Sequence, residues 1–384
     1  MKVYFDNAAT TPIHPQVFEK MKPFFLENFG NASSIHSFGR NVRVAIEESR
    51  EVIADFINAN PSEIYFTSGG TEANNFVTFG IARSELKESG RKHLITSKAE
   101  HYSIYDSFFE LSNNGFEVNF LNVDKDSIVR NKAVLQNINS STSLISLMHI
   151  NNETGAIYPI EKTSPLTKQQ NIFFHSDSVQ SFGKYKINVK ASGINSITAS
   201  AHKINGPKGI GFAYVKSGTP LSPILFGGSQ ERNRRGGTEN VAGIVGFAEA
   251  VRLVKDSMQS NTNHVNNLKL KFIAGITSID KKGIIINGGE NTSAYILSIT
   301  LKSDYYKNDS EALLMFLDIN RVAASNGAAC SSGTVKPSHV LLAAGYSTDD
   351  AKGTIRFSFG WQNTLDEVDY TLEVLKKLVN KFKK

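Results

Sequence analysis

One lysine, Lys203, lies in a setting that suits covalent chemistry. It belongs to the stretch S-A-H-K-I-N-G-P-K-G (residues 200–209), where Ser200 and His202 flank it and a Gly/Pro turn follows. Most lysines are solvated surface residues, which is the alternative interpretation. Asp177 ends an apolar, strand-like run farther upstream. A Lys and an Asp at the ends of neighbouring strands suit pyridoxal phosphate: the lysine attaches the cofactor, and the aspartate pairs with its pyridinium nitrogen.

A glycine-containing turn is the second candidate site. The stretch S-G-G-T-E (residues 68–72) lies between an expected strand and an expected helix. Glycines let backbone N–H groups approach a ligand, and a helix N-terminus favours an anion. We therefore expect Gly70 and Thr71, together with Ser200 and His202, to bind the phosphate of the cofactor. An ordinary turn with Thr71 as a helix cap is the alternative.

The only cysteine, Cys330, follows N-G-A-A and precedes S-S-G (residues 326–333). A lone cysteine is most often a buried, inert residue. This stretch has no large apolar side chain, so it predicts an accessible loop, and a nearby positive charge or dipole would favour the thiolate. One cysteine excludes an intramolecular disulfide, favours a reducing compartment, and cannot by itself hold zinc or an iron–sulfur cluster.

An arginine, Arg356, lies in the strand-like run T-I-R-F-S-F (residues 354–359). A buried arginine needs an anionic partner, and a substrate carboxylate fits its two-pronged geometry. An intramolecular salt bridge is the alternative. The Gly-rich stretch 227–240 carries three further arginines and is otherwise typical of a solvated basic loop.

Composition excludes several classes of protein. The chain has 384 residues, of which 40% are hydrophobic and 20% charged, as in ordinary globular proteins. The net charge of +6 is spread along the chain, so we expect no nucleic-acid partner. No signal-like N-terminus and no apolar run of membrane-spanning length are visible. The nine histidines lack metal-ligand spacing. We expect a cytoplasmic protein with no membrane association and no metal.

The elements that must position these residues alternate along the first two thirds of the chain. This alternation predicts right-handed βαβ units, a mostly parallel sheet and an α/β fold. Strands are expected at residues 3–5, 64–67, 93–96, 116–121, 144–149, 172–177, 197–199 and 210–215, and helices from residue 15, at 42–57, from 73, at 103–111 and around 162–170. His149 and His175 fall inside strand patterns and are expected to be core residues.

Two apolar patterns give more detailed expectations. The helix from Pro15 is expected to carry Val17, Met21, Phe24 and Phe25 on one face. The helix at 42–57 is amphipathic, with Val44, Ile53 and Ile57 among its apolar positions.

The composition of the chain changes near residue 250. A helix at 240–254 is expected to leave a large domain (residues 16–250) for a small domain (residues 1–15 and 251–384). A polar stretch at 257–264 is expected to precede a helix through 273. The later elements expected are strands at 295–301 and 354–359, helices at 311–317 and 340–344, and a C-terminal helix at 365–378.

Nine further motifs surround the lysine segment in a fixed order. They are D-N-A-A-T-T-P (6–12), F-G-N-A-S-S (29–34), T-S-G-G-T-E-A-N-N (67–75), E-H (100–101), N-N-E-T-G (151–155), H-S-D-S-V-Q-S (175–181), R-R-G-G-T-E-N (234–240), A-A-C-S-S-G (328–333) and I-R-F-S-F-G (355–360). Together they resemble the cysteine desulfurases related to NifS and IscS over nearly the whole chain. The resemblance implies a fold-type I pyridoxal phosphate-dependent transferase of the class V aminotransferase family. Its large domain has a mostly parallel sheet flanked by helices, and its small C-terminal domain is α+β.

The resemblance also implies roles for single residues. His101 would stack on the cofactor ring and shuttle a proton, and Gln180 would donate to the ring hydroxyl. Asn152 would contact the ring and the substrate carboxylate, and Asn31 is a weaker candidate for that carboxylate beside Arg356. The N-terminal arm would pack on the small domain.

The same resemblance implies a homodimer, in which Thr238 reaches the cofactor phosphate of the partner subunit. Two positions depart from the family's pattern: Gly70 stands where Ala is usual, and Ala201 where Gly is usual. The loop before Cys330 lacks the usual hydroxyl side chains, which puts its hydrogen bonds and the rate in doubt.

The activity implied is conversion of L-cysteine to L-alanine. Lys203 would remove the Cα proton, and Cys330 would take the sulfur as a persulfide. An iron–sulfur scaffold or a tRNA-thiolation carrier would then accept it. Two alternatives remain: another fold-type I enzyme (an aminotransferase or selenocysteine lyase), or a non-catalytic scaffold or regulatory homologue. An aminotransferase would not need Cys330, and a non-catalytic protein would not need Lys203, Asp177, His101 and Cys330 together.

Overall fold

The centre of the molecule is a seven-stranded sheet. The structure, a computed structural model, describes residues 1–327 and 336–384. Strand order is β2-β8-β7-β6-β5-β3-β4. The strands from β7 to β4 are parallel, whereas β8 is antiparallel to both β2 and β7. The strands are β2 (Ile64–Thr67), β3 (His93–Ser97), β4 (Glu117–Leu121), β5 (Thr142–Ser146), β6 (Phe173–Asp177), β7 (Ser196–Ser200) and β8 (Gly211–Val215). The predicted α/β class with a mostly parallel sheet is confirmed.

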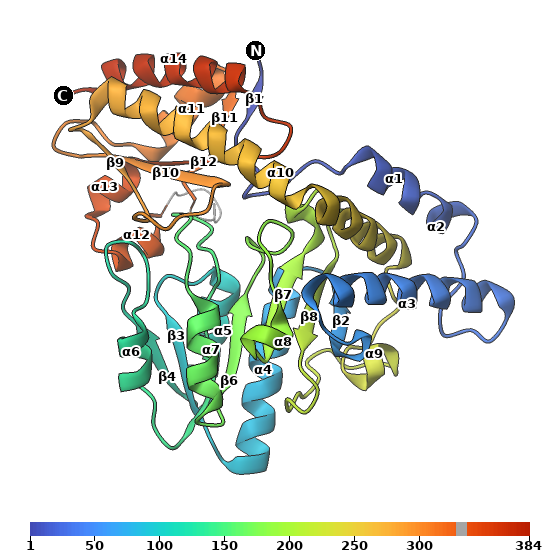
Figure 1. Cartoon of the computed structure of the whole chain (residues 1–384). Coiled ribbons are helices and arrows are strands. Elements are labelled where there is room, and N and C mark those ends of the chain that lie inside the picture. Colours follow the sequence, from blue (N-terminus) through green and yellow to red (C-terminus); the bar gives the residue numbers. More distant parts are fainter. Residues whose placement is uncertain (328–335) are drawn as a thin grey trace.

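Helices cover both faces of this sheet (Figure 1). Neighbouring strand residues point to opposite faces, because side chains alternate along a strand. Leu94 and Leu144 therefore belong to one apolar cluster with α4 and α5, while Ile95 and Ile145 belong to another with α3 and α10. The helices around the sheet are α3 (Ser37–Ile57), α4 (Gly70–Ser89), α5 (Tyr102–Asn113), α6 (Asn131–Gln136), α7 (Ile160–Lys168), α8 (Val189–Ser192) and α9 (Gln230–Asn233), with short 3-10 turns at Pro61–Glu63 and Ala201–Lys203.

A second core lies on the C-terminal part of the chain. It is built on an antiparallel sheet, β12-β10-β9, and on the helices α11 and α14. The elements here are β9 (Ile284–Ile286), β10 (Ile296–Leu301), α11 (Ser310–Ile319), β11 (Val322–Ala323), α12 (His339–Ala343), α13 (Thr348–Lys352), β12 (Thr354–Ser358) and α14 (Leu365–Phe382).

One long helix, α10 (Val241–Asp280), joins the two cores. Phe247 and Val251 from its first turns belong to the core of the large sheet, and Leu268 and Phe272 belong to the second core. Figure 1 shows α10 running from beside α3 to α14. The helix passes residue 250 without a break. The two cores agree with the predicted division into residues 16–250 and residues 1–15 with 251–384, which stays a prediction.

The N-terminal arm packs on the second core, as expected. β1 (Val3–Tyr4) pairs in parallel with β11, and Asp6 bridges to Ser358 of β12. Phe5 is fully buried among Phe272, Phe357 and Phe359. The arm then reaches the segment that follows β7, where Thr11 Oγ1 donates to the carbonyl oxygen of His202.

Three expectations about the helices were wrong. The polar stretch 257–264 lies inside α10, because it crosses between the two cores, where polar side chains such as Thr262 bond the preceding turn. The first helical pattern splits into α1 (Pro15–Met21) and α2 (Pro23–Leu26), since proline interrupts the hydrogen bonding, and Phe25 is 60% exposed. Val44 is exposed, although Ile53 and Ile57 are buried as expected.

One strand ends earlier than predicted. β5 stops at Ser146, so His149 is buried beyond the strand and not within it. His175 does lie in β6 and is fully buried, and burial lowers its pKa to about 3. Helices within residues 1–327 and 336–384 are all too short or too polar to cross a membrane.

Candidate active site

A cavity of about 470 Å³ lies where β6, β7 and the loop after β3 end. The carboxyl ends of parallel strands are the usual place for ligands in such sheets. The cavity collects most of the residues singled out in the sequence: Gly70, Thr71, His101, Asn152, Asp177, Gln180, Ser200, His202, Lys203 and Arg356. The N-terminal arm, loops of the large sheet and β12 of the second core therefore all line this cavity.

Lys203 ends the short 3-10 turn after β7 and reaches the N-terminal arm. Its Nζ donates to the carbonyl oxygens of Ala8 (2.5 Å) and Ala9 (2.7 Å). Burial, and then the positive charge of Arg356, lower the pKa of Lys203 to about 8. A lysine of this kind is neutral in a useful fraction of molecules near pH 7, as a nucleophile or base requires.

Asp177 is a buried carboxylate at the end of β6. Its Oδ2 accepts a hydrogen bond from Asn74 Nδ2 (2.8 Å), and its Oδ1 accepts one from the backbone N–H of Val179 (2.9 Å). Asn74 is held in turn by Thr198 of β7. No cation of the described chain is paired with Asp177, so the site can accept a protonated ring nitrogen.

The other end of the cavity suits an anion. Gly70 and Thr71 begin α4, whose first amides have no intrahelical acceptor. A Cβ on Gly70 would lie 2.8 Å from Val179 Cγ2, so this chain pairs a glycine with a bulky neighbour. Ser200 ends β7, and His202 bonds Thr10 Oγ1 through Nδ1 (3.1 Å).

Two histidines of the cavity are held as neutral imidazoles. Burial and the charge of Lys203 lower the pKa of His202 to about 4. His101 caps α5, its Nδ1 accepting from the backbone N–H of Ser103 (3.1 Å). Its side chain lines the cavity, and burial by the surrounding protein atoms lowers the pKa of His101. Because Nδ1 is an acceptor, the proton of neutral His101 is on Nε2.

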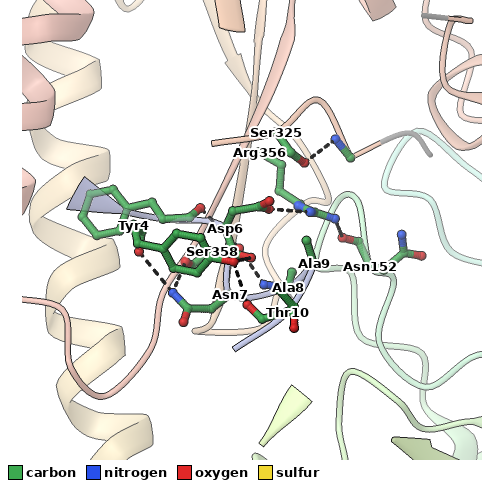
Figure 2. A network of polar contacts seen from close by, with 12 residues as sticks. Tyr4, Asp6, Asn7, Ala8, Ala9, Thr10, Asn152, Ser325, Arg356 and Ser358 are labelled. Carbon is green, nitrogen blue, oxygen red and sulfur yellow. Dashed lines mark hydrogen bonds and ion pairs between the residues drawn. The ribbon is translucent and has the colours of Figure 1, made fainter. Parts of the chain in front are cut away.

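Arg356 of β12 is buried and bonds two segments distant in sequence (Figure 2). Its Nη2 pairs with Asp6 Oδ1 (2.9 Å), and its Nη1 donates to the carbonyl oxygen of Asn152 (2.7 Å). The intramolecular salt bridge left open above is therefore present. Arg356 Nε and Asn152 Oδ1 are buried and have no hydrogen-bond partner in the described chain. Each residue thus keeps one unsatisfied polar atom within the described part of the chain.

Two predicted residues lie outside this cavity, and the structure does not describe a third. Thr238 is exposed beside a separate cavity of about 80 Å³. Asn31 is exposed, with its Oδ1 accepting from the backbone N–H of Ser33 (2.8 Å). Cys330 lies outside the residues that the structure describes. Their proposed contacts stay predictions.

The sequence analysis missed five residues of the site or its support. Asp6 and Asn74 lie in quoted motifs, and motif membership was the available signal. Glu153 and His339 line the cavity, and Lys184 bonds Gln180 from behind. Glu153 also belongs to a motif, whereas nothing in the local pattern marks Lys184 or His339.

Comparisons with known proteins agree over the full length. Residues 3–371 match the family model "Aminotransferase class-V". "Cysteine desulfurase IscS" of Dictyoglomus turgidum is 42% identical over 384 residues, which is 100% of this chain and 95% of the relative. A solved "NIFS-LIKE PROTEIN" superposes with a TM-score of 0.91 at 32% identity, covering 100% of both chains. The structure "SspA in complex with cysteine" has a TM-score of 0.82 at 34% identity, covering 95% of this chain and 100% of that one.

The chain belongs to the aminotransferase class-V family, and its activity depends on pyridoxal phosphate. Within this family it is a member of the NifS/IscS group of cysteine desulfurases. The site also fits the cofactor by its geometry. Among the described residues it offers a buried carboxylate with no paired cation, a lysine whose Nζ donates to two carbonyl oxygens, and a helix N-terminus.

Proposed function

We propose that this protein, a pyridoxal phosphate-dependent cysteine desulfurase, converts L-cysteine to L-alanine and holds the sulfur as a persulfide on Cys330. The observation that carries the proposal is the placement of Lys203, Asp177 and Arg356 around one cavity. The relatives named cysteine desulfurase and the neighbour solved with cysteine support the choice of substrate.

The proposed reaction balances without a further oxidant. The Cβ–S bond of cysteine breaks and an S–S bond forms to Cys330, so cysteine and the thiol give alanine and the persulfide. The sulfur is oxidised by two electrons, and these electrons reduce Cβ to the methyl group of alanine. A second thiol or a carrier protein then reduces the persulfide or accepts its outer sulfur.

Four residues would hold the cofactor around its ring. Lys203 would attach it, Asp177 would bind the protonated ring nitrogen, Gln180 would donate to the ring hydroxyl, and His101 would pack against the ring face. Gly70, Thr71, Ser200 and His202 would bind the phosphate. When bound, the cofactor supplies an electron sink that makes the Cα proton of the substrate acidic.

The remaining steps use side chains of this chain. Arg356 and Asn152 would bind the substrate carboxylate, with Asn31 as a weaker candidate. The lowered pKa of Lys203 makes its amine a suitable acceptor for the Cα proton. His101, with its proton on Nε2, would exchange that proton with the substrate. Cys330 would attack the substrate sulfur as a thiolate.

A homodimer is part of the proposal. The loops around Ile35 and Phe226 expose apolar side chains (91% and 79%), and a cavity of about 180 Å³ lined by Ser33 and Gln230 joins the two loops. Such a surface is typical of an interface. Thr238 lies on the same segment and would contact the cofactor phosphate of the second subunit.

The proposed acceptor is an iron–sulfur scaffold or a tRNA-thiolation carrier. Because the chain has one cysteine and so forms no internal disulfide, we place it in the reducing cytoplasm.

Alanine release tests the proposal. The cofactor-loaded protein is given L-cysteine and a thiol reductant, and we expect equal amounts of alanine and sulfide. Cys330→Ser should bind the cofactor with unchanged affinity and lose at least a hundredfold in alanine formation, because no nucleophile remains. Titration with a thiol reagent provides a control, since the unfolded parent has one thiol and the variant none. Pyruvate in place of alanine, or parental turnover by the variant, contradicts the proposal.

A further inference from the structure

Lys184 is a buried lysine behind the candidate site. It lies in the turn that follows β6, and its side-chain ammonium has one hydrogen bond in the described chain, to Gln180 Oε1 (3.2 Å). The ring of Tyr295 lies 5.3 Å from its Nζ. No carboxylate of the described residues pairs with it. A buried cation without a counter-ion is costly, and such groups are common at functional sites.

The partner of Lys184 faces the candidate site. Gln180 lines the cavity, and its Nε2 donates to the carbonyl oxygen of Ala8 (2.9 Å). That carbonyl oxygen also accepts from Lys203. Gln180 therefore bonds Lys184 on one side and shares an acceptor with Lys203 on the other.

The chemistry of the two side chains fixes the direction of the Gln180 amide. An amide group has an acceptor end and a donor end of nearly equal size, so it can turn over. Below its pKa the lysine side chain carries only donors, and its Nζ lies 3.2 Å from the amide oxygen of Gln180, the acceptor that it then requires. The amide nitrogen must then point to Ala8 and the cavity, where it has a second proton to give.

We infer that Lys184 is a positioning residue that orients the amide of Gln180 toward the cofactor. The inference rests on the proposed role of Gln180 as donor to the ring hydroxyl. Without Lys184 only the carbonyl oxygen of Ala8 would favour this direction of the amide. A larger part of the molecules would then present the amide oxygen to the cavity. The cofactor would then lose the selective contact to its hydroxyl.

Contacts from α10 and from Tyr295 hold Lys184 in place. Thr262 of α10 donates to its carbonyl oxygen (3.2 Å) and contacts the hydroxyl of Tyr295 (3.1 Å). Tyr295 immediately precedes β10. Thr262 and Tyr295 therefore both follow the predicted large domain's elements in the sequence. The lysine is thus supported from outside the cavity, as a positioning residue should be.

Lys269 offers a matched control. It is also buried, and burial lowers its pKa to about 8, as it lowers that of Lys184 to about 7. Its Nζ donates to Thr292 Oγ1 (2.7 Å) and to the carbonyl oxygen of Ser293 (2.8 Å). It does not line the candidate site. A general effect of losing a buried ammonium would therefore appear in both lysines.

The test measures recognition of the ring hydroxyl. The full-length protein, freed of cofactor, is titrated with pyridoxal 5'-phosphate and with 3-deoxypyridoxal 5'-phosphate, and the ratio of the two dissociation constants is compared. We expect Lys184→Met and Gln180→Ala each to lower the preference for the hydroxyl roughly tenfold, and the double variant to lower it no further. Lys269→Met should leave the ratio unchanged, even if it lowers thermal stability.

A second variant, Lys184→Gln, keeps the inference testable if Lys184→Met does not fold. Lys184→Gln is neutral but keeps an N–H donor for Gln180, so we expect the preference to fall less than threefold. A full loss in Lys184→Gln would contradict the inference.

Two further results would overturn it in distinguishable ways. If Gln180→Ala lowers the preference and Lys184→Met does not, or if their effects add, Lys184 does not act through Gln180. If Gln180→Ala itself keeps the preference, the proposed role of Gln180 is wrong and the role of Lys184 falls with it. Neither result touches the proposed desulfuration, which the alanine assay measures separately.

Discussion

Glu100, next to His101 in the chain, is a fully buried carboxyl group. Its Oε1 accepts from the backbone N–H of Met148 (3.0 Å) and from Ser97 Oγ (3.2 Å), while its Oε2 has no partner in the described chain. Burial, and then the nearby charge of Asp177, raise the pKa of Glu100 to about 8. The group is therefore protonated in the folded protein at neutral pH.

This carboxyl group makes stability depend on pH. Its pKa is higher in the folded than in the unfolded chain, so the folded state binds more protons between about pH 4.5 and 8. Stability from this group is fully present below that window and is lost as pH rises through it. We predict that Glu100→Gln flattens this loss and raises stability at pH 8 by roughly 1 to 3 kcal/mol.

Urea unfolding at pH 5 and pH 8 measures the effect. Glu117→Gln is the control, because Glu117 is an exposed surface partner of Lys92 and should change little. A steeper loss of stability with pH in Glu100→Gln than in the parent would contradict a protonated Glu100.

At Arg356, kinetics can separate the two roles that the structure permits. The side chain already pairs with Asp6, and its Nε has no hydrogen-bond partner among the described residues. We predict that Arg356→Lys raises the KM for cysteine at least tenfold with little change in cofactor affinity, because a lysine is a point charge without the fork of arginine.

Steady-state alanine formation gives the KM, and the absorbance of bound cofactor gives the affinity. Arg252→Lys is a matched control, since Arg252 forms an exposed pair with Glu249. An unchanged KM in Arg356→Lys would leave Arg356 with the salt bridge alone.

At the scale of elements, the N-terminal arm links the second core to the candidate site. Phe5 anchors this arm among three buried phenylalanines, and three residues later Ala8 offers its carbonyl oxygen to Lys203. The position of that carbonyl oxygen therefore depends on packing in the second core.

We predict that Phe5→Ala lowers the free energy of unfolding by about 3 to 5 kcal/mol, as expected for a large core residue. Thermal or urea unfolding measures the loss. Phe109→Ala serves as the control because Phe109 is 56% exposed and should cost less than about 1 kcal/mol. Equal effects of the two substitutions would show that the arm does not contribute to the core.

At the scale of the whole molecule, the exposed apolar loops bear on assembly. Ile35 lies on the loop between α2 and α3, and Phe226 lies on the loop between β8 and α9. The cavity lined by Ser33 and Gln230 lies between these loops. We predict that Ile35→Asp combined with Phe226→Asp converts the proposed homodimer to a monomer, because charges in an apolar interface remain unpaired. Cofactor affinity should fall at least tenfold with it, since Thr238 would no longer reach the second subunit.

Sedimentation velocity with a parallel cofactor titration tests both effects. Ile319→Asp is the control, as Ile319 is 74% exposed on α11 of the second core. A parent protein that sediments as a monomer would contradict the homodimer.

The local sequence determined a large part of this protein. Apolar periodicity predicted each strand of the large sheet to within a few residues, because burial on both faces requires apolar runs. Turn chemistry and motif order marked Lys203, Asp177 and Gly70, because special backbone and polar residues at strand ends leave a local signature. The polar middle of α10 predicted a break between two helices, but the helix is continuous. Its two ends are each packed in a core, which stabilises the polar turns between them.

Only the tertiary structure decided which groups complete the site. Arg356 pairs with Asp6 across 350 residues, and Lys203 bonds a carbonyl oxygen of the N-terminal arm. The local sequence does not mark Lys184, because the role that we propose for it depends on its contacts with Gln180 and Tyr295, which form only in the folded chain. Periodicity reports the face that a residue buries, whereas partners distant in sequence depend on how whole elements pack.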